Sequence, residues 1–392
     1  MNVVNKKWNY KKLGDVCTVE RGGSPRPIDD YITDNPAGIN WIKIGDTNDE
    51  SMFITQTAQK ILPEGMKKSR YVRPGDFLLS NSMSFGRPYI LKIDGCIHDG
   101  WLVLRDKENV FDKRFLYYYL SSKPTYQKFK MMAVGGVVNN LNSEMVRGVD
   151  VPIPGKDEQV KIADVLDKIS RIIAYKKKEL VKSDDLIKAR FVEMFGDPDI
   201  NPLGWPKYTF EEISDLITDG EHATPKRFNQ GIYLLSARNV LNHALSFDKI
   251  DYIDQVEYDR ISKRIIPQEG DVLISCSGTI GRTCTVPEGL KFQFVRSVAL
   301  IRFKKTINPI FMEHQITMPF IQKQIDSSKS QSSQANLFQG KIRKLLAVVP
   351  PKELQEQFLS FVKQIDKSKV AVQKSLEQTQ MLFDSLMQQY FG

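Results

Sequence analysis

Two long stretches of the chain, residues 155–196 and 351–392, carry apolar residues spaced three and four positions apart. This spacing predicts a helix with one apolar seam, which is typical of a coiled coil. Each helix would hold about 38 residues and measure roughly 57 Å. Because an exposed seam is unfavourable, we expect the two helices to pair with each other in antiparallel orientation; separate binding of each helix to another protein is the alternative. The helix-pairing positions are Ile162, Leu166, Ile169, Ile173, Leu180 and Ile187 in the first stretch and Phe358, Val362, Ile365, Val372, Leu376 and Phe383 in the second.

Residues 1–154 and 197–350 have a different pattern, in which short apolar runs are broken by Gly, Pro, Asn and Asp. Runs such as 76–80 and 298–303 have the length and the flanking breakers of strands. Helix-like segments follow at 113–122 and 309–319. The pattern therefore predicts an α+β globular module in each half of the chain.

The two halves are an internal repeat. Phe195-Gly196 recurs as Phe391-Gly392, an offset of 196 residues, and Pro154 recurs as Pro350 at the same offset. Nearer the start of each half the offset drifts by about a residue, which marks loop insertions around a shared scaffold. The fold class is therefore predicted to be α+β: two globular domains, 1–154 and 197–350, joined by two long antiparallel coiled-coil helices, 155–196 and 351–392, with internal pseudo-two-fold symmetry.

Composition changes this picture only modestly. Hydrophobic residues make up 41% and charged residues 26%, as in a folded globular protein. Lysine and arginine number 56 against 47 acids, a net charge of +9 that favours a polyanionic partner. No apolar run is long enough to cross a membrane and the N-terminus lacks a signal-peptide pattern, so we expect a cytoplasmic protein. The four scattered cysteines are expected to be reduced and packed as small hydrophobic residues.

Motifs for catalysis are missing from the sequence. There is no Gly-rich cofactor loop with a catalytic Asn/Asp-Pro-Pro-aromatic or Pro-Cys element, and no G-x-x-x-x-G-K-[ST] phosphate loop. The histidines have no metal-ligand spacing and are expected to be surface or packing residues, so no metal site is expected. We therefore expect no catalytic residues here, and assign catalysis to partner proteins.

The two modules differ in their loops although they share a frame. Residues 21–27 read RGGSPRP, whereas the corresponding 219–227 read DGEHATPKR. Two modules with different loops, held apart by a rigid helical spacer, suit the recognition of a DNA target made of two unlike half-sites.

Two duplicated motifs and one junction segment make this interpretation specific. The entry to each long helix reads PIPGKDEQVKIADVLDKI and VVPPKELQEQFLSFVKQID, a strand–turn segment reads GDFLLSNSMSFGR and GDVLISCSGTIGR, and the junction reads ARFVEMFGDPDINPLGWPKYTFEEISDLITDG. In the order of these motifs and in their duplication, the chain resembles the DNA-specificity subunits of type I restriction–modification enzymes over essentially its full length.

The resemblance implies two target-recognition domains that each read half of an asymmetric bipartite DNA sequence. It also implies that two methyltransferase (modification) subunits dock on this chain and that restriction subunits join them. S-adenosylmethionine, ATP and Mg would then belong to the partner subunits, with no cofactor on this chain. The alternative is a non-catalytic scaffold that bridges proteins through two binding modules on a coiled coil. The first copy has neither the Asp nor the His of the second copy's 219–225 loop, so base contacts cannot be carried from one copy to the other.

Candidate DNA-binding residues fall into two groups. Hydroxyls and an arginine recur in the strand–turn segment of both copies, where they would serve as scaffold or contact phosphates, while residues that read bases should lie where the copies differ. The recurrent group is Ser80, Ser82, Arg87, Ser275, Ser277 and Arg282, and the divergent group is Arg26, Lys43, Asn48, Lys226, Arg227, Arg238 and Asn239.

Overall fold

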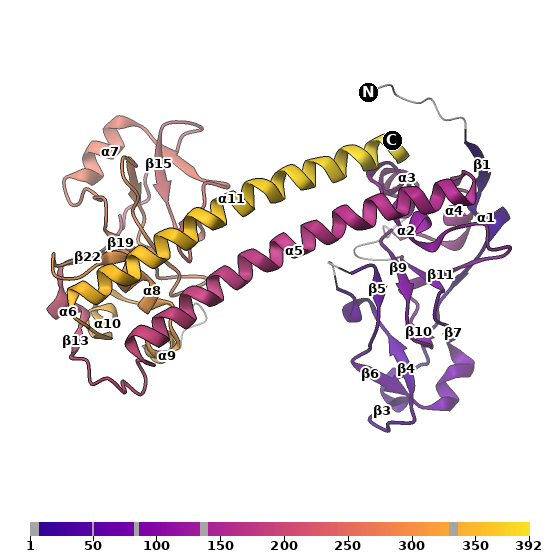
Figure 1. Ribbon diagram of the computed structural model, residues 1–392, viewed down its shortest axis with the longest axis horizontal. Coiled ribbons are helices and arrows are strands. Elements are labelled where there is room, and N and C mark those ends of the chain that lie inside the picture. The colour runs from indigo at the N-terminus through magenta and orange to yellow at the C-terminus, as the bar shows by residue number, and fades with distance from the viewer. Residues whose placement is uncertain (1–7, 49–50, 82–85, 134–139, 329–335) are drawn as a thin grey trace. The chain divides into compact units, whose positions relative to one another are not determined.

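The computed structural model describes residues 8–48, 51–81, 86–133, 140–328 and 336–392. Its internal contacts divide the chain into two compact units. The first consists of residues 1–178 and 373–392, and the second of residues 179–372 (Figure 1).

The first unit contains two five-stranded sheets and a two-stranded antiparallel ribbon. One sheet has the order β2-β11-β8-β9-β5 and the other the order β3-β6-β4-β10-β7. The ribbon pairs β1 with β12, which brings the two ends of the module together. The strands are β1 Asn9–Lys12, β2 Cys17–Arg21, β3 Ile32–Thr33, β4 Ile39–Ile42, β5 Phe53–Ile54, β6 Gln59–Ile61, β7 Arg70–Val72, β8 Phe77–Ser80, β9 Pro88–Leu91, β10 Gly95–Ile97, β11 Trp101–Asp106 and β12 Asp150–Ile153; the helices are α1 Leu13–Val16, α2 Lys113–Ser121, α3 Lys123–Ala133, α4 Ser143–Arg147 and the first part of α5 Lys156–Phe195, with 3-10 helices at Ile28–Asp30, Ile44–Asp46 and Pro63–Lys68.

The second unit repeats this plan with smaller sheets. A four-stranded sheet has the order β14-β22-β19-β20, a three-stranded sheet the order β18-β15-β21, and ribbons pair β13 with β23 and β16 with β17. The strands are β13 Lys207–Thr209, β14 Ser214–Asp219, β15 Ile232–Leu235, β16 Val240–Leu241, β17 Ala244–Leu245, β18 Asp251–Ile253, β19 Val272–Ser275, β20 Thr283–Thr285, β21 Phe292–Phe294, β22 Val298–Phe303 and β23 Leu346–Val348; the helices are α6 Phe210–Ile213, α7 Gln255–Ser262, α8 Pro309–Ile316, α9 Pro319–Ser328, α10 Gln339–Ile342 and the first part of α11 Lys352–Phe391, with a 3-10 helix at Ala237–Asn239.

A buried glutamine at the start of each long helix makes the same hydrogen bonds in both units. Gln159 accepts a hydrogen bond from the backbone N–H of Asp112 at 2.7 Å, and Gln355 accepts one from Asn308 at 2.8 Å. Asp112 and Asn308 are the N-caps of α2 and α8. The repeated motif seen in the sequence therefore connects the long helix to the helix that follows each sheet.

The seam of the long helices is shared between helix pairing and module packing. Ile162 and Leu166 belong to the core of the first unit, together with Phe391 from the end of α11. Ile187 and Phe358 belong to the core of the second unit. The seam was predicted to pair with the other long helix, and its two ends are in addition anchored in the module cores. Of the other predicted seam residues, Ile169, Ile173 and Val362 are buried, and Leu180, Ile365, Val372, Leu376 and Phe383 are partly buried.

Contacts within each unit show that α5 and α11 run antiparallel. In the first unit, Lys176 Nζ donates to Ser375 Oγ at 2.8 Å. In the second unit, Lys369 Nζ lies 2.6 Å from Asp184 Oδ1, and the ring of Phe191, near the end of α5, lies 5.4 Å from that of Phe358, near the start of α11. The predicted α+β class with paired long helices is confirmed.

Candidate nucleic-acid interface

The loops that differ between the copies lie at one edge of the main sheet in each unit. In the second unit β22 is antiparallel to both β14 and β19. The C-terminal ends of β14 and β19 therefore lie beside the start of β22. We call this end of the strands the edge of the sheet. A cavity of about 800 Å³ opens there. Its polar lining comes from four separate segments: Asp219, Glu221, His222, Thr224, Arg227, Ser277, Arg296, Ser297, Asn336 and Gln339.

Asp219 is the centre of a charged network at this edge. Its carboxylate lies 2.6 Å from Arg264 Nη2 and 2.8 Å from His222 Nε2. Burial by itself would raise the pKa of Asp219, but hydrogen bonds from Arg264 and His222 lower it below its usual value. The carboxylate is therefore ionised at neutral pH and orients two side chains that can donate hydrogen bonds.

The same edge exists in the first unit, where hydrogen bonds identify the equivalent positions. Gly22 N–H donates to Trp101 O at 2.9 Å, and Gly220 N–H donates to Val298 O at 3.1 Å. Trp101 is therefore the counterpart of Val298. Counting back two residues from each makes Asp99 the counterpart of Arg296.

Charge is reversed between these equivalent edges. The first unit carries Arg21 at the end of β2 and Asp99 before β11, whereas the second carries Asp219 at the end of β14 and Arg296 before β22. Arg21 Nε donates to the Asp99 backbone oxygen at 3.1 Å. Because the scaffold is kept and the charge is inverted, the two edges present different hydrogen-bonding patterns to a ligand.

Asp99 is held by its own neighbours. Ser24 Oγ donates to its carboxylate at 2.9 Å, and Arg26, whose side chain is 82% exposed, lies 3.6 Å away. Burial would raise the pKa of Asp99, but the hydrogen bonds from Ser24 and from its own backbone N–H lower it. Of the predicted residues in the first copy, Arg26 is thus at the edge and accessible.

Of the two roles expected for Ser80 and Ser275, scaffold or phosphate contact, their burial supports the scaffold and not the contact with DNA. They are 1% and 0% exposed. The Oγ of each accepts a hydrogen bond, at 3.0 Å, from the backbone N–H of the arginine that closes the turn. These hydroxyls stabilise the strand–turn segment, so the segment recurs for a structural reason. Ser82 lies outside the described residues, and Ser277 lines the 800 Å³ cavity.

Asn239 was also wrongly assigned to DNA binding, because it is 0% exposed. Its side-chain oxygen accepts from the backbone N–H of Ser236 at 3.0 Å, and its Nδ2 donates to Ser246 O at 3.0 Å. The amide shapes the turn before β16, a role that asparagine often has.

The remaining predicted residues lie at the surface or partly exposed, and their part in DNA binding stays a prediction. Arg227 and Arg238 share the carboxylate of Asp251, at 3.1 and 2.9 Å. Lys43 donates to Gln59 at 2.6 Å. The rest are Asn48, which is exposed, Arg87, whose guanidinium lies 5.4 Å from the Tyr89 ring centroid, Lys226, whose ammonium lies 5.2 Å from that of Phe228, and Arg282, which is partly buried.

Sequence reasoning missed Arg264, Arg296 and Gln339. Arg296 could have been found by aligning the residues before the last long strand of each module, where it corresponds to Asp99 of the first copy. Arg264 gave no such signal, because it reaches Asp219 across 45 residues of chain.

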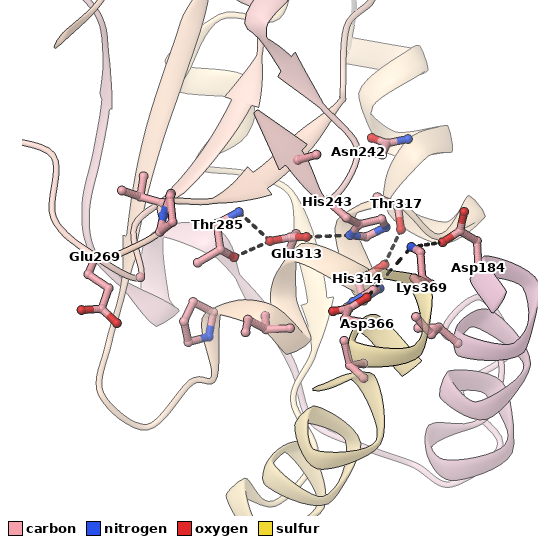
Figure 2. A pocket seen from close by; sticks show the side chains of 18 of the residues that line it. Asp184, Asn242, His243, Glu269, Thr285, Glu313, His314, Thr317, Asp366 and Lys369 are labelled. Carbon is pink, nitrogen blue, oxygen red and sulfur yellow. Dashed lines mark hydrogen bonds and ion pairs between the residues drawn. The ribbon is translucent and has the colours of Figure 1, made fainter. Parts of the chain in front are cut away.

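Two further expectations concern other residues. All four cysteines are free and buried, as expected. Of the histidines, which were expected to be surface or packing residues, His243 is partly exposed, lies 2.6 Å from Glu313 and lines a second cavity, of about 620 Å³ (Figure 2). Among the described residues, no helix is long and apolar enough to span a membrane.

Comparisons with known proteins agree with the duplicated plan. The family described as type I restriction modification DNA specificity domain matches twice, at residues 5–182 and 202–379. The chain is 22% identical to the type I restriction enzyme MjaIX specificity subunit of Methanocaldococcus jannaschii, over 98% of this chain and 92% of that protein. It is 21% identical to the Escherichia coli EcoBI specificity subunit, over 99% and 86%.

Solved structures show the same fold. A type I restriction–modification S subunit from M. genitalium matches with a TM-score of 0.56 at 14% identity, over 99% of this chain and 97% of that one. A chain from a study of the assembly and conformational transition of a type I R-M system matches with a TM-score of 0.59 at 15% identity, over 98% and 97%. With two matched domains that together span most of its length, the chain belongs to the type I restriction modification DNA specificity family.

Proposed function

We propose that this chain is the specificity subunit of a type I restriction–modification system and recognises an asymmetric, bipartite DNA sequence. The observation that carries the proposal is the pair of equivalent strand-end edges. The same backbone hydrogen bonds build both edges, yet Arg21 and Asp99 stand where the other copy has Asp219 and Arg296. Donors and acceptors placed differently on one frame suit two different sets of base edges.

Catalysis in this proposal belongs to partner subunits. The chain would carry two methyltransferase subunits, and restriction subunits would join the complex in the cytoplasm. S-adenosylmethionine, ATP and Mg would bind those partners, since the sequence has neither a cofactor loop nor a phosphate loop. The net charge of +9 supports a polyanionic ligand.

Sequencing of methylated bases tests the proposal directly. The chain is co-expressed with its methyltransferase subunit in a host that lacks other methylation, and the genome is sequenced for modified bases. We expect one motif with two unlike half-sites and a spacer of constant length. A complex that methylates no defined bipartite motif would refute the proposal.

Arg296→Ala examines the role of the second edge. If Arg296 reads a base, binding should weaken by about 1–3 kcal/mol and specificity should relax at one position of a single half-site. Lys305→Ala is the matched control, because Lys305 is an exposed cation beyond the opposite end of β22. The alternative, a protein-bridging scaffold, predicts that neither variant changes the methylated motif. A protein-bridging scaffold should also bind its protein partners with an affinity that depends little on salt, whereas the affinity for DNA should fall steeply as the salt concentration rises.

A further inference from the structure

The second unit contains a cluster of two histidines and a glutamate that the DNA-recognition edge does not use. His243 lies in the turn between β16 and β17, and Glu313 and His314 are consecutive residues of α8. One donor atom from each residue lies within 4.8 Å of the other two. The three side chains line the cavity of about 620 Å³ beside the facing parts of α5 and α11 (Figure 2).

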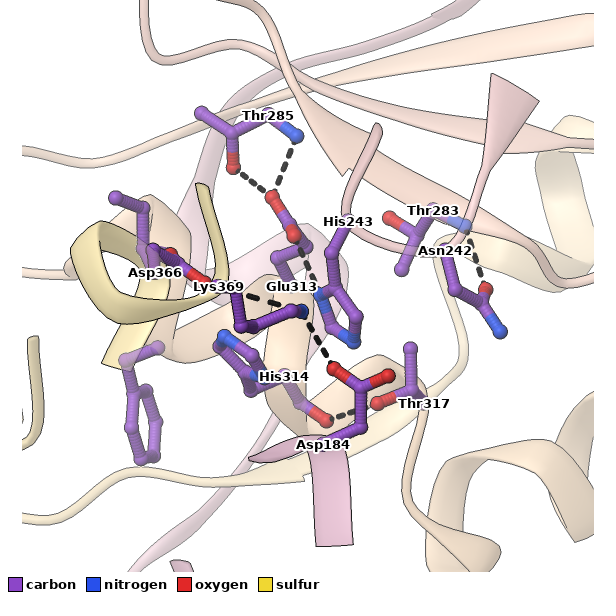
Figure 3. A network of polar contacts seen from close by, with 12 residues as sticks. Asp184, Asn242, His243, Thr283, Thr285, Glu313, His314, Thr317, Asp366 and Lys369 are labelled. Atoms are coloured by element: carbon purple, nitrogen blue, oxygen red, sulfur yellow. Dashed lines mark hydrogen bonds and ion pairs between the residues drawn. The ribbon is translucent and has the colours of Figure 1, made fainter. Parts of the chain in front are cut away.

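Hydrogen bonds hold Glu313 in place. Its Oε1 lies 2.6 Å from His243 Nδ1, and its Oε2 accepts hydrogen bonds from both the backbone N–H and the hydroxyl of Thr285 (Figure 3). A carboxylate oriented by such neighbours is typical of metal sites, where the surrounding groups set the direction of the ligand.

His314 is a buried imidazole without a hydrogen bond. It is 7% exposed, and among the described residues neither of its ring nitrogens has a hydrogen-bond partner. Its ring stacks on that of His243 with centroids 4.1 Å apart. The ring nitrogens of His314 are therefore available as metal ligands at the cavity.

The fold does not require polar residues at these positions. At the offset of 196 residues, Glu313 and His314 correspond to Tyr117 and Tyr118 of α2. The Tyr118 hydroxyl donates to Asp167 Oδ1 at 2.7 Å, so the first copy fills the same place with an aromatic side chain that has its own partner. The cluster is therefore a property of the second module alone.

Charge around the cavity favours a cation, although the chain as a whole is basic. The lining holds five carboxylates, Asp184, Glu269, Glu288, Glu313 and Asp366, against two lysines, Lys188 and Lys369. Lys369 is engaged by Asp184 at 2.6 Å and lies 4.0 Å from Asp366. Asp366, whose side chain is 55% exposed, also lines the cavity.

We propose that His243, Glu313 and His314 bind a Zn²⁺-class transition-metal ion in this cavity. Two imidazoles and a carboxylate are a donor set that zinc prefers, with metal–ligand distances of about 2.0–2.2 Å. Tetrahedral binding requires donor atoms about 3.3 Å apart, so the stacked rings rotate to close the cluster around the ion. The bound ion ties the β16–β17 hairpin to α8 in the second unit.

Zinc binding by the full chain, purified without a histidine tag and stripped with a chelator, tests this proposal. Titration with ZnCl₂ against a chromophoric chelator should show one tight site per chain in the wild type. His243→Asn should weaken that site at least about 100-fold, because a direct ligand is worth no less than the neighbours that orient it. Asparagine keeps accessible the φ of +62° that His243 adopts, so this variant is expected to fold.

His222→Asn is the matched control, since His222 also contacts a carboxylate, at 2.8 Å, but lies in the other cavity. It should bind zinc like the wild type. Zinc should also raise the Tm of the wild type and of His222→Asn, and leave that of His243→Asn unchanged. Absence of a tight site in the wild type, or equal binding by His243→Asn, overturns the proposal. Either result leaves the DNA-recognition proposal intact, because methylated motifs are read in a separate experiment.

Discussion

Phe358 is the residue through which α11 enters the core of the second unit, and its truncation is the most direct test of that packing. The side chain is 0% exposed. Its ring meets Phe191 at 5.4 Å, Phe195 at 5.7 Å and Phe311 at 6.4 Å in edge-to-face geometry. Two of these rings belong to the end of α5, so one side chain joins both long helices and α8.

Phe358→Ala removes the buried ring and leaves a cavity, which typically costs about 3–5 kcal/mol. At roughly 2–4 °C per kcal/mol for a unit of this size, the Tm should fall by roughly 6–20 °C. Calorimetry of the full chain measures the shift, and circular dichroism checks that the variant is folded at low temperature. Phe338→Ala is the control, because Phe338 is 61% exposed and its loss should change stability by less than about 0.5 kcal/mol. If both variants lowered the Tm equally, Phe358 would not anchor the helix as described.

Three other predictions concern pH, thiols and the long helices. The pKa of Asp219 is lowered in the folded chain, so its ionised carboxylate should stabilise the fold above the unfolded pKa of about 3.9. That contribution is lost as the pH falls through the folded pKa. Asp219→Asn should therefore have a lower free energy of unfolding than the wild type at pH 7, and the difference should disappear in acid. Burial raises the pKa of Cys17 and Cys276 to about 12, so these thiols should resist a disulfide reagent at about pH 8 until denaturant unfolds the chain, and fast labelling of the native protein would contradict their burial. Four residues inserted into each long helix should lengthen the pair by roughly 6 Å and widen the spacer of the methylated motif by about two base pairs, with both half-sites unchanged; an unaltered spacer would show that the helices do not set it.

Local patterns explain why much of the fold could be predicted. The seam residues recur at helical spacing over about 38 positions, and at that length helix is the one regular structure that places them on one face. The offset of 196 residues predicted two equivalent modules, and the twin contacts of Gln159 and Gln355 show the same scaffold in both. Short strands were legible as a class, but their order in the sheets depends on pairing between distant segments, which a local pattern does not encode.

The candidate site was predicted less well. Ser80, Ser275 and Asn239 resemble surface hydrogen-bonding groups in the sequence, yet their side chains are buried and bonded within their own turns. Composition cannot separate a hydroxyl that faces solvent from one that closes a turn, because both roles use the same residue types.

By itself the sequence determined the repeat, the long paired helices and the α+β modules, because each follows from periodicity or from similarity at a constant offset. Only the tertiary structure decided which side chains meet at the sheet edges and in the cavities. Each sheet edge brings together two charged residues that are distant in the chain, Arg21 with Asp99 and Asp219 with Arg296. His243 likewise contacts Glu313, and in all three pairs the residues are about 70 to 80 positions apart. Such contacts arise from how strands pair and helices pack across the module, and that information is distributed over the whole chain.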